Sequence, residues 1–171
     1  MIDLLPDVEE RQIVESVVDV LKSRCPVERL RERALPAGTV ERREWKRFAE
    51  LGWFGLGLPA ALGGVGFTLV EETLVFREFG RFVLSPSMLA ASLAARIAAH
   101  AGQRELAGAI LDGSERPALA IPAGAAGTFA LSARAAVGEL HLVDAADADL
   151  LAVWTEEGAA LLRRSDLRAV G

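Results

Sequence analysis

The stretch that decides the fold runs from Trp45 to Pro86 and reads WKRFAELGWFGLGLPAALGGVGFTLVEETLVFREFGRFVLSP. At its start, Trp45, Phe48 and Leu51 recur at helical spacing. Gly52 follows directly, and glycine is the residue that most readily ends a helix in the left-handed conformation. The pattern therefore predicts a helix that stops at Gly52.

The middle of the stretch predicts a loop and then a second helix. Residues 54–67 contain a proline and several glycines among apolar residues, which is typical of a tight loop pinned to a core or lying beside a ligand. Thr68 and Glu71 then stand at the spacing of a capping box, in which a hydroxyl and a carboxylate satisfy the first backbone N–H groups of a helix. We expect this helix to extend to about Gly80.

Further helices are expected on both sides. Apolar residues at three- and four-residue spacing predict an amphipathic helix over about 7–24. Thr39 is the expected N-cap of the helix that contains Trp45. Ser85 and Pro86 predict the start of an alanine-rich helix that ends near residue 102, and a short helix is expected over 104–111.

The pattern changes after Pro117, where short apolar runs alternate with glycine and acidic residues. This spacing is typical of hairpins in an antiparallel sheet. The runs are Ala118–Ile121, Phe129–Ala133, Leu140–Val143, Leu150–Trp154 and Ala159–Leu162. We therefore predict an α+β fold with an all-α helical domain over 1–114 and a partial antiparallel β domain over 115–171.

Composition restricts the function classes. The chain has 171 residues, a net charge of -5 and 51% apolar residues, so it has material for a core but no basic footprint for nucleic acid. Cys25 is the lone cysteine, which excludes an internal disulfide. The N-terminus lacks the pattern of a signal peptide, and no apolar run is long enough to cross a membrane. We expect a cytoplasmic protein.

The helical part resembles the N-terminal domain of the acyl-CoA dehydrogenase family of flavoenzymes. The resemblance rests on a leucine-glycine turn, a proline, a double glycine and the helix after it. The matching segments are Leu51-Gly52-Trp53, Leu58-Pro59, Gly63-Gly64, Glu78-Phe79-Gly80 and Ser85-Pro86. The resemblance implies that this region packs against a flavin-bearing β domain and helps to form an acyl pocket.

The β part departs from the family where flavin is expected. The family segment A-L-A-L-T-E-P-x-A-G-S-D aligns with residues 118–129, which places Pro122 at the hydroxyl position and keeps only Gly127-Thr128 of the glycine-serine pair. The family's aromatic-I-T-N strand aligns with residues 141–144, where Val143 replaces the threonine. Proline and valine side chains donate no hydrogen bond. The positions that the resemblance assigns to flavin are Ile121, Pro122, Gly127, Thr128, His141, Leu142 and Val143.

The resemblance implies FAD as cofactor, an acyl-CoA thioester as substrate, and α,β-dehydrogenation as the reaction. It also implies a C-terminal helical domain that carries the glutamate base and much of an oligomer interface, and no counterpart of it occurs within these residues. We therefore expect the chain alone to be inactive and to form homo- or hetero-oligomers. No catalytic residue and no metal ligand is assigned.

Other interpretations stay open. The chain can be a noncatalytic subunit that completes a hetero-oligomer with a full-length paralogue, or a flavin-free helical interaction or acyl-binding module. Among the titratable residues, helix capping and an exposed helix face account for Glu71, Glu72 and Glu78 better than catalysis does. His100 fits a favourable position near a helix C-terminus, and Asp144 fits a turn.

Overall fold

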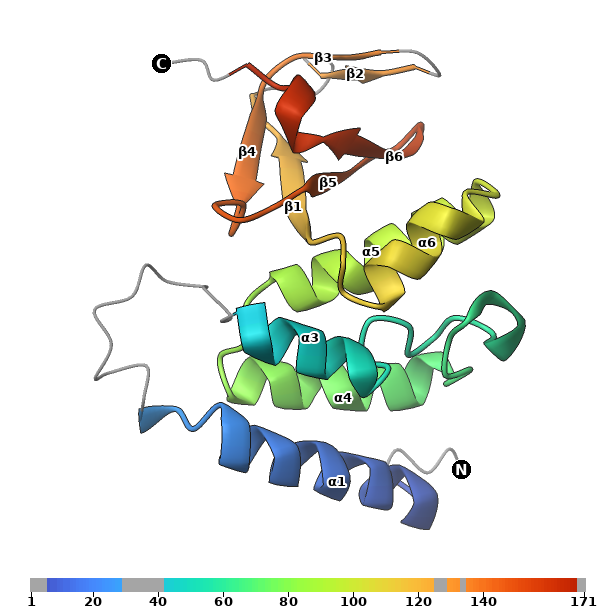
Figure 1. Cartoon of the computed structure of the whole chain (residues 1–171), viewed down its shortest axis with the longest axis vertical. Coiled ribbons are helices and arrows are strands. Elements are labelled where there is room, and N and C mark those ends of the chain that lie inside the picture. Colours follow the sequence, from blue (N-terminus) through green and yellow to red (C-terminus); the bar gives the residue numbers. More distant parts are fainter. Residues whose placement is uncertain (1–5, 29–41, 125–128, 133–134, 169–171) are drawn as a thin grey trace.

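The computed structural model describes residues 6–28, 42–124, 129–132 and 135–168 (Figure 1). Helices fill one end of the molecule and a small sheet fills the other. Helices α5 (Ser87–His100) and α6 (Arg104–Leu111) lie between the remaining helices and the sheet. The predicted order, a helical domain followed by a partial sheet, is confirmed.

Helix α1 (Val8–Arg24) begins one residue after the predicted start at about residue 7 and ends where predicted. Asp7 is its N-cap and accepts a hydrogen bond from the Glu10 amide at 2.8 Å, while Glu10 accepts one from the Asp7 amide at 2.7 Å. Its buried residues are Val17 and Leu21, and the helix packs against α4 (Leu69–Arg81).

Helix α3 (Arg42–Glu50) and the loop after it form the aromatic core. Gly52 adopts a φ of 75°, as predicted for a left-handed residue at a helix end. The chain then turns back, so that the rings of Phe48 and Trp53 stack at 4.8 Å and those of Trp45 and Phe54 lie 4.3 Å apart. The loop contains a short 3₁₀ helix, Ala60–Leu62. The predicted N-cap Thr39 lies outside the described residues.

The starts of α4 and α5 follow the sequence signals closely. The amide of Thr68 donates to Glu71 Oε2 at 2.5 Å, which is half of the predicted capping box. The assigned N-cap of α5 is Pro86 rather than the expected Ser85, although the amide of Ser87 does donate to the Ser85 hydroxyl at 3.0 Å. Gly102 separates α5 from α6 at a φ of 73°.

The main sheet has the strand order β4-β1-β5-β6. A separate two-stranded sheet pairs β2 with β3. The strands are β1 (Pro117–Pro122), β2 (Ala130–Leu131), β3 (Ala136–Val137), β4 (Leu140–Val143), β5 (Leu150–Thr155) and β6 (Gly158–Arg163), and a 3₁₀ turn, Arg164–Asp166, follows them.

One strand pair differs from the predicted antiparallel arrangement. The pairs β1–β4 and β5–β6 are antiparallel, but β1 and β5 are parallel. The reason is topological. Strand β4 runs back along one edge of β1, so the chain leaves β4 at the end of the sheet where β1 begins. Strand β5 then pairs with the opposite edge of β1 and runs in the same direction. The sheet is therefore mixed rather than wholly antiparallel.

The sheet shares its core with the helices on one face. Leu150, Ala152 and Leu161 pack into the main helical core, and α5 contacts β1, β5 and β6. The opposite face forms a smaller cluster of its own, to which Phe129 and Leu151 belong. Helices and sheet thus share one buried core, which does not divide the chain at a particular residue. The domain boundary at residues 114–115 stays a prediction.

Candidate functional site

Pairing of β1 with β4 brings together the described residues predicted to face flavin. Ile121 lies directly opposite His141, and Pro122 lies opposite Leu140. Residues 121–122 and 140–143 therefore form one compact end of the sheet, which we call the β1–β4 edge. Gly127 and Thr128 lie outside the described residues.

The residues of the β1–β4 edge lie on both faces of the sheet. Leu119 pairs with Ala152, which belongs to the helical core, and with Val143. Because side chains alternate along a strand and paired residues share a face, Ile121, His141 and Val143 lie on the face toward α5. Pro122 and Leu142 lie on the other face. The aligned strands therefore do not turn all of the assigned side chains toward one ligand.

The chemistry of the β1–β4 edge is largely apolar. Ile121 is 45% exposed and Leu142 is 37% exposed, while His141 is exposed and Pro122 is half-buried. The imidazole of His141 is the one assigned side chain described here that can donate a hydrogen bond, since Pro122 lacks even a backbone N–H. The described side chains of this edge therefore offer a flavin ring a single hydrogen-bond donor.

Asp144 fixes the position of this edge relative to the helices. It follows β4 at a φ of 54°, and its Oδ2 accepts hydrogen bonds from the hydroxyls of Ser87, at 2.8 Å, and Ser85. Burial raises the pKa of this carboxyl, although the Ser87 hydrogen bond and Arg116 oppose the shift. A turn was predicted at Asp144, but the link to α5 was not.

A second link joins the loop before β1 to the helical core. The Arg116 guanidinium lies 4.9 Å from the ring centroid of Trp45, and Nη1 is 3.8 Å from Asp147. The Arg116 amide donates to Asp149 Oδ2 at 2.9 Å. Helices and sheet are therefore joined by polar contacts as well as by the shared core.

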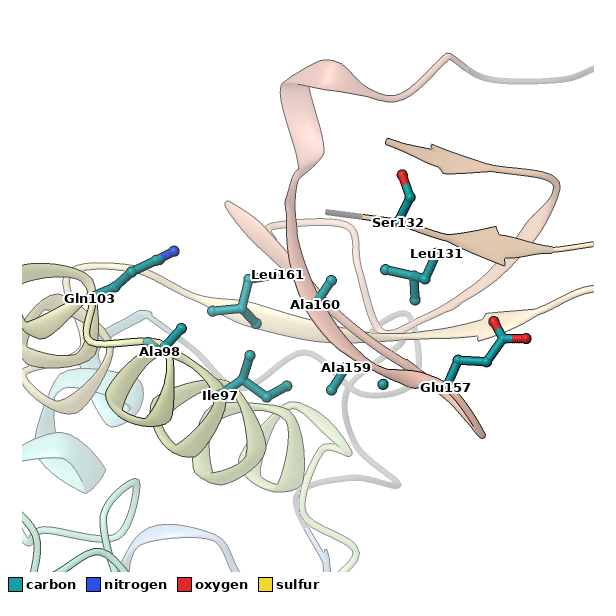
Figure 2. Close-up of a pocket in the computed structure, with 11 residues that line it drawn as sticks. Ile97, Ala98, Gln103, Leu131, Ser132, Glu157, Ala159, Ala160 and Leu161 are labelled. Carbon is teal, nitrogen blue, oxygen red and sulfur yellow. The ribbon is translucent and has the colours of Figure 1, made fainter. Parts of the chain in front are cut away.

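A cavity of about 420 Å³ lies between the end of α5, strand β6 and strand β2 (Figure 2). Figure 2 shows Ile97 and Ala98 of α5 on one side and Leu131 of β2 on another. A neighbouring cavity of about 660 Å³ is lined by Leu93, Arg96, Ile97, His100, Ala101, Trp154 and Ala159. None of the described residues assigned to flavin lines either cavity.

The prediction of an exposed face for Glu72 and Glu78 is wrong, whereas the capping role of Glu71 is confirmed. Glu72 is 4% exposed and accepts from the Ser92 hydroxyl at 3.0 Å and from Arg96. Glu78 is fully buried, yet it is not isolated. It accepts from Arg77 and Arg81, each at 3.0 Å. A carboxylate is stable in a core when such partners satisfy it.

Other kinds of site find no support within the described ranges. No cluster of three or more His, Cys, Asp or Glu residues there is arranged to hold a metal ion. Within the same ranges, no helix combines the length and apolar character that a membrane crossing requires.

Comparison with known proteins agrees with this architecture. The sequence model of the acyl-CoA dehydrogenase N-terminal domain matches residues 7–113. A search of curated proteins found no match.

Solved structures show the same fold across the chain. The ChsE4-ChsE5 complex from Mycobacterium tuberculosis is 21% identical, with a TM-score of 0.71 over 96% of this chain and 50% of that one. The Tcur3481-Tcur3483 steroid ACAD is 20% identical, with a TM-score of 0.65 over 94% and 48%. PigA with FAD and proline is 17% identical, with a TM-score of 0.68 over 95% and 50%. The chain thus spans about half the length of the structures it resembles.

Proposed function

The chain belongs to the acyl-CoA dehydrogenase family, and from this premise we propose that it takes part in the α,β-dehydrogenation of an acyl-CoA thioester. In this proposal it supplies the helical domain and part of the β domain of a FAD-dependent assembly. The observation that carries the proposal is the family match over residues 7–113. The sequence resemblance supports it further, since it assigns the family's flavin-facing strands to the paired strands β1 and β4.

The reaction sets what else the assembly must contain. Dehydrogenation of a thioester needs a base that takes the α-proton and a flavin that accepts the β-hydride. The family resemblance assigns that base to a C-terminal helical domain, and the β1–β4 edge offers His141 as its one side-chain donor. In the proposal, the base and the remaining flavin contacts therefore come from polypeptide outside residues 1–171, and this chain packs against them.

A second candidate is a noncatalytic subunit paired with a full-length paralogue. Pro122 and Val143 favour it, because both stand where the family carries hydroxyls and each lost hydrogen bond weakens cofactor binding by about 1 kcal/mol. The names of the two similar complexes each list two components, which fits an assembly of unlike chains.

Purification of the tagged chain from its own host separates these candidates. The proposal expects a complex that carries FAD and reduces a dye when an acyl-CoA is added. A partner that keeps FAD and dye reduction after this chain is removed identifies the chain as the noncatalytic subunit. A clean, colourless monomer from that host contradicts both.

A further inference from the structure

The cavity of about 660 Å³ beside α5, here called the α5 hollow, has apolar walls. Leu93 and Ile97 of the helix face Trp154 at the end of β5 and Ala159 at the start of β6. Trp154 is 44% exposed, a large apolar area for a residue on the helix-facing side of a sheet. The α5 hollow can therefore hold an apolar body against an aromatic wall.

Arg96 and His100 of α5 both line this apolar space, and Arg96 is held in place. Its guanidinium pairs with Glu72, whose side chain is 6% exposed, and the other oxygen of Glu72 accepts from Ser92 at 3.0 Å. Gly57 leaves the space that this pair occupies, since a Cβ at that position would overlap the guanidinium and crowd the carboxylate. The loop, α4 and α5 together fix where Arg96 points.

A guanidinium carries five N–H donors, and the described residues give Arg96 a single acceptor, Glu72. The side chain is 31% exposed, so its remaining donors are accessible from the hollow. A fixed guanidinium binds a carboxylate with little loss of side-chain entropy and in a bidentate geometry. Both oxygens of Glu72 accept hydrogen bonds, from Ser92 and Arg96, so the carboxylate holds the guanidinium in one position.

From this arrangement we infer that the α5 hollow binds an apolar molecule carrying one carboxylate, with the carboxylate on Arg96 and the apolar body against Trp154. Ile97, Ala101 and Ala159 line both this hollow and the cavity of Figure 2, so the two cavities are adjacent. The site is separate from the β1–β4 edge. It stands whether or not the chain serves a dehydrogenase.

The direct test compares ligands that differ only in their head group. Dodecanoate, dodecanol and dodecyltrimethylammonium are titrated into the purified chain below their micelle concentrations, with calorimetry and tryptophan fluorescence as readouts. We expect dodecanoate to bind about tenfold more tightly than dodecanol, and the cation to bind most weakly. No binding of dodecanoate, equal binding of acid and alcohol, or stronger binding of the cation each overturns the inference.

Variants locate the site. Trp154→Ala is expected to weaken dodecanoate binding at least about fivefold, and Arg96→Lys, which keeps the charge beside Glu72, to reduce the preference for acid over alcohol. Val137→Ala is the matched control, because Val137 is 67% exposed on β3 and away from the hollow. Thermal melting confirms that each variant is folded. Unchanged dodecanoate affinity in folded Trp154→Ala places the ligand elsewhere and contradicts the inference.

Discussion

The helical part and the β1–β4 edge differ in the polar groups that they contain and in how those groups are paired. The helical core buries Glu72 and Glu78 and gives each of them hydrogen-bond partners from neighbouring side chains. The β1–β4 edge exposes Ile121 and Leu142 and offers one side-chain donor, His141. The comparison teaches that the helical part supplies partners for the carboxylates it buries, while the described side chains at the edge offer a ligand a single hydrogen-bond donor, His141.

The two regions also differ in what a substitution should cost. In the helical part, close contacts and buried charges leave little room for change. At the edge, backbone pairing fixes the strands, and the side chains of Ile121, His141 and Leu142 are exposed. Substitutions in the two regions should therefore differ most in their effect on the free energy of unfolding.

The largest effect is expected for Gly64→Ala in the apolar loop. A Cβ at Gly64 would overlap the carbonyl oxygen of Leu58, which already accepts from the Gly66 amide at 2.8 Å. We expect the free energy of unfolding to fall by about 3 kcal/mol, measured by urea denaturation. Gly80→Ala is the control: no atom lies near its added Cβ, and alanine in a helix should raise stability by about 0.5 kcal/mol. Equal stability of the two variants contradicts a rigid loop.

A smaller loss is expected for Glu72→Gln. The amide leaves the Arg96 guanidinium without its buried carboxylate, and because Arg96 is itself partly exposed we expect a cost of about 2 kcal/mol. The neighbouring Glu71→Gln serves as a matched control, since glutamine can still accept from the Thr68 amide. If both variants unfold at the same urea concentration, the buried pair contributes nothing to the helical core.

Asp144 lies at the joint between the two regions and makes their contact pH-dependent. Burial raises the pKa of its carboxyl in the folded chain above the unfolded value, so its contribution to stability is complete at low pH and is lost as pH rises through the raised pKa. Asp144→Asn, which removes the charge and keeps an acceptor for a serine hydroxyl, should be more stable than the wild type at pH 7 by less than about 1 kcal/mol.

Urea denaturation of both proteins between pH 4 and pH 7 checks this prediction for Asp144. The advantage of the variant should shrink as the pH falls through the raised pKa. An advantage that grows toward pH 4, or a variant that is clearly less stable at pH 7, shows that the ionised carboxylate stabilises the joint.

The smallest effect is expected at the edge itself. Ile121→Thr should change the free energy of unfolding by less than about 0.5 kcal/mol, because its side chain is 45% exposed. Leu119→Thr, two residues earlier on the same face but only 8% exposed, should cost about 2 kcal/mol. A large loss for Ile121→Thr in thermal melting shows that the edge is packed rather than open.

Local signals explain why so much of the helical part was predictable. The Thr68–Glu71 spacing and the Gly52 turn act within a few residues, so the sequence contains the whole interaction. The pairing of Glu72 with Arg96 joins positions 24 residues apart on different helices, and no local pattern reports it. Burial of an acidic residue on an amphipathic helix therefore could not be predicted without the fold.

The positions of the strands could be predicted from the sequence, but the order and direction in which they pair could not. Alternating apolar runs place the strands, whereas the parallel pairing of β1 with β5 depends on which edge of β1 the intervening β4 occupies. The predicted flavin-facing set came from a family resemblance. Strand pairing does place Ile121 beside His141, yet alternation turns Pro122 to the other face. A residue's alignment with a family position therefore does not determine on which face of the sheet its side chain lies.

The most direct test of the central comparison is the visible absorption spectrum of the purified chain after incubation with FAD and removal of free cofactor. The wild type should be colourless and folded, while Val143→Thr, which restores one of the two hydroxyl donors that the resemblance expects at the edge and does so on the face of Ile121 and His141, should retain more flavin than the matched Val137→Thr control. A stoichiometric flavin band in the wild type contradicts the account, because it shows that the edge binds the cofactor without those donors.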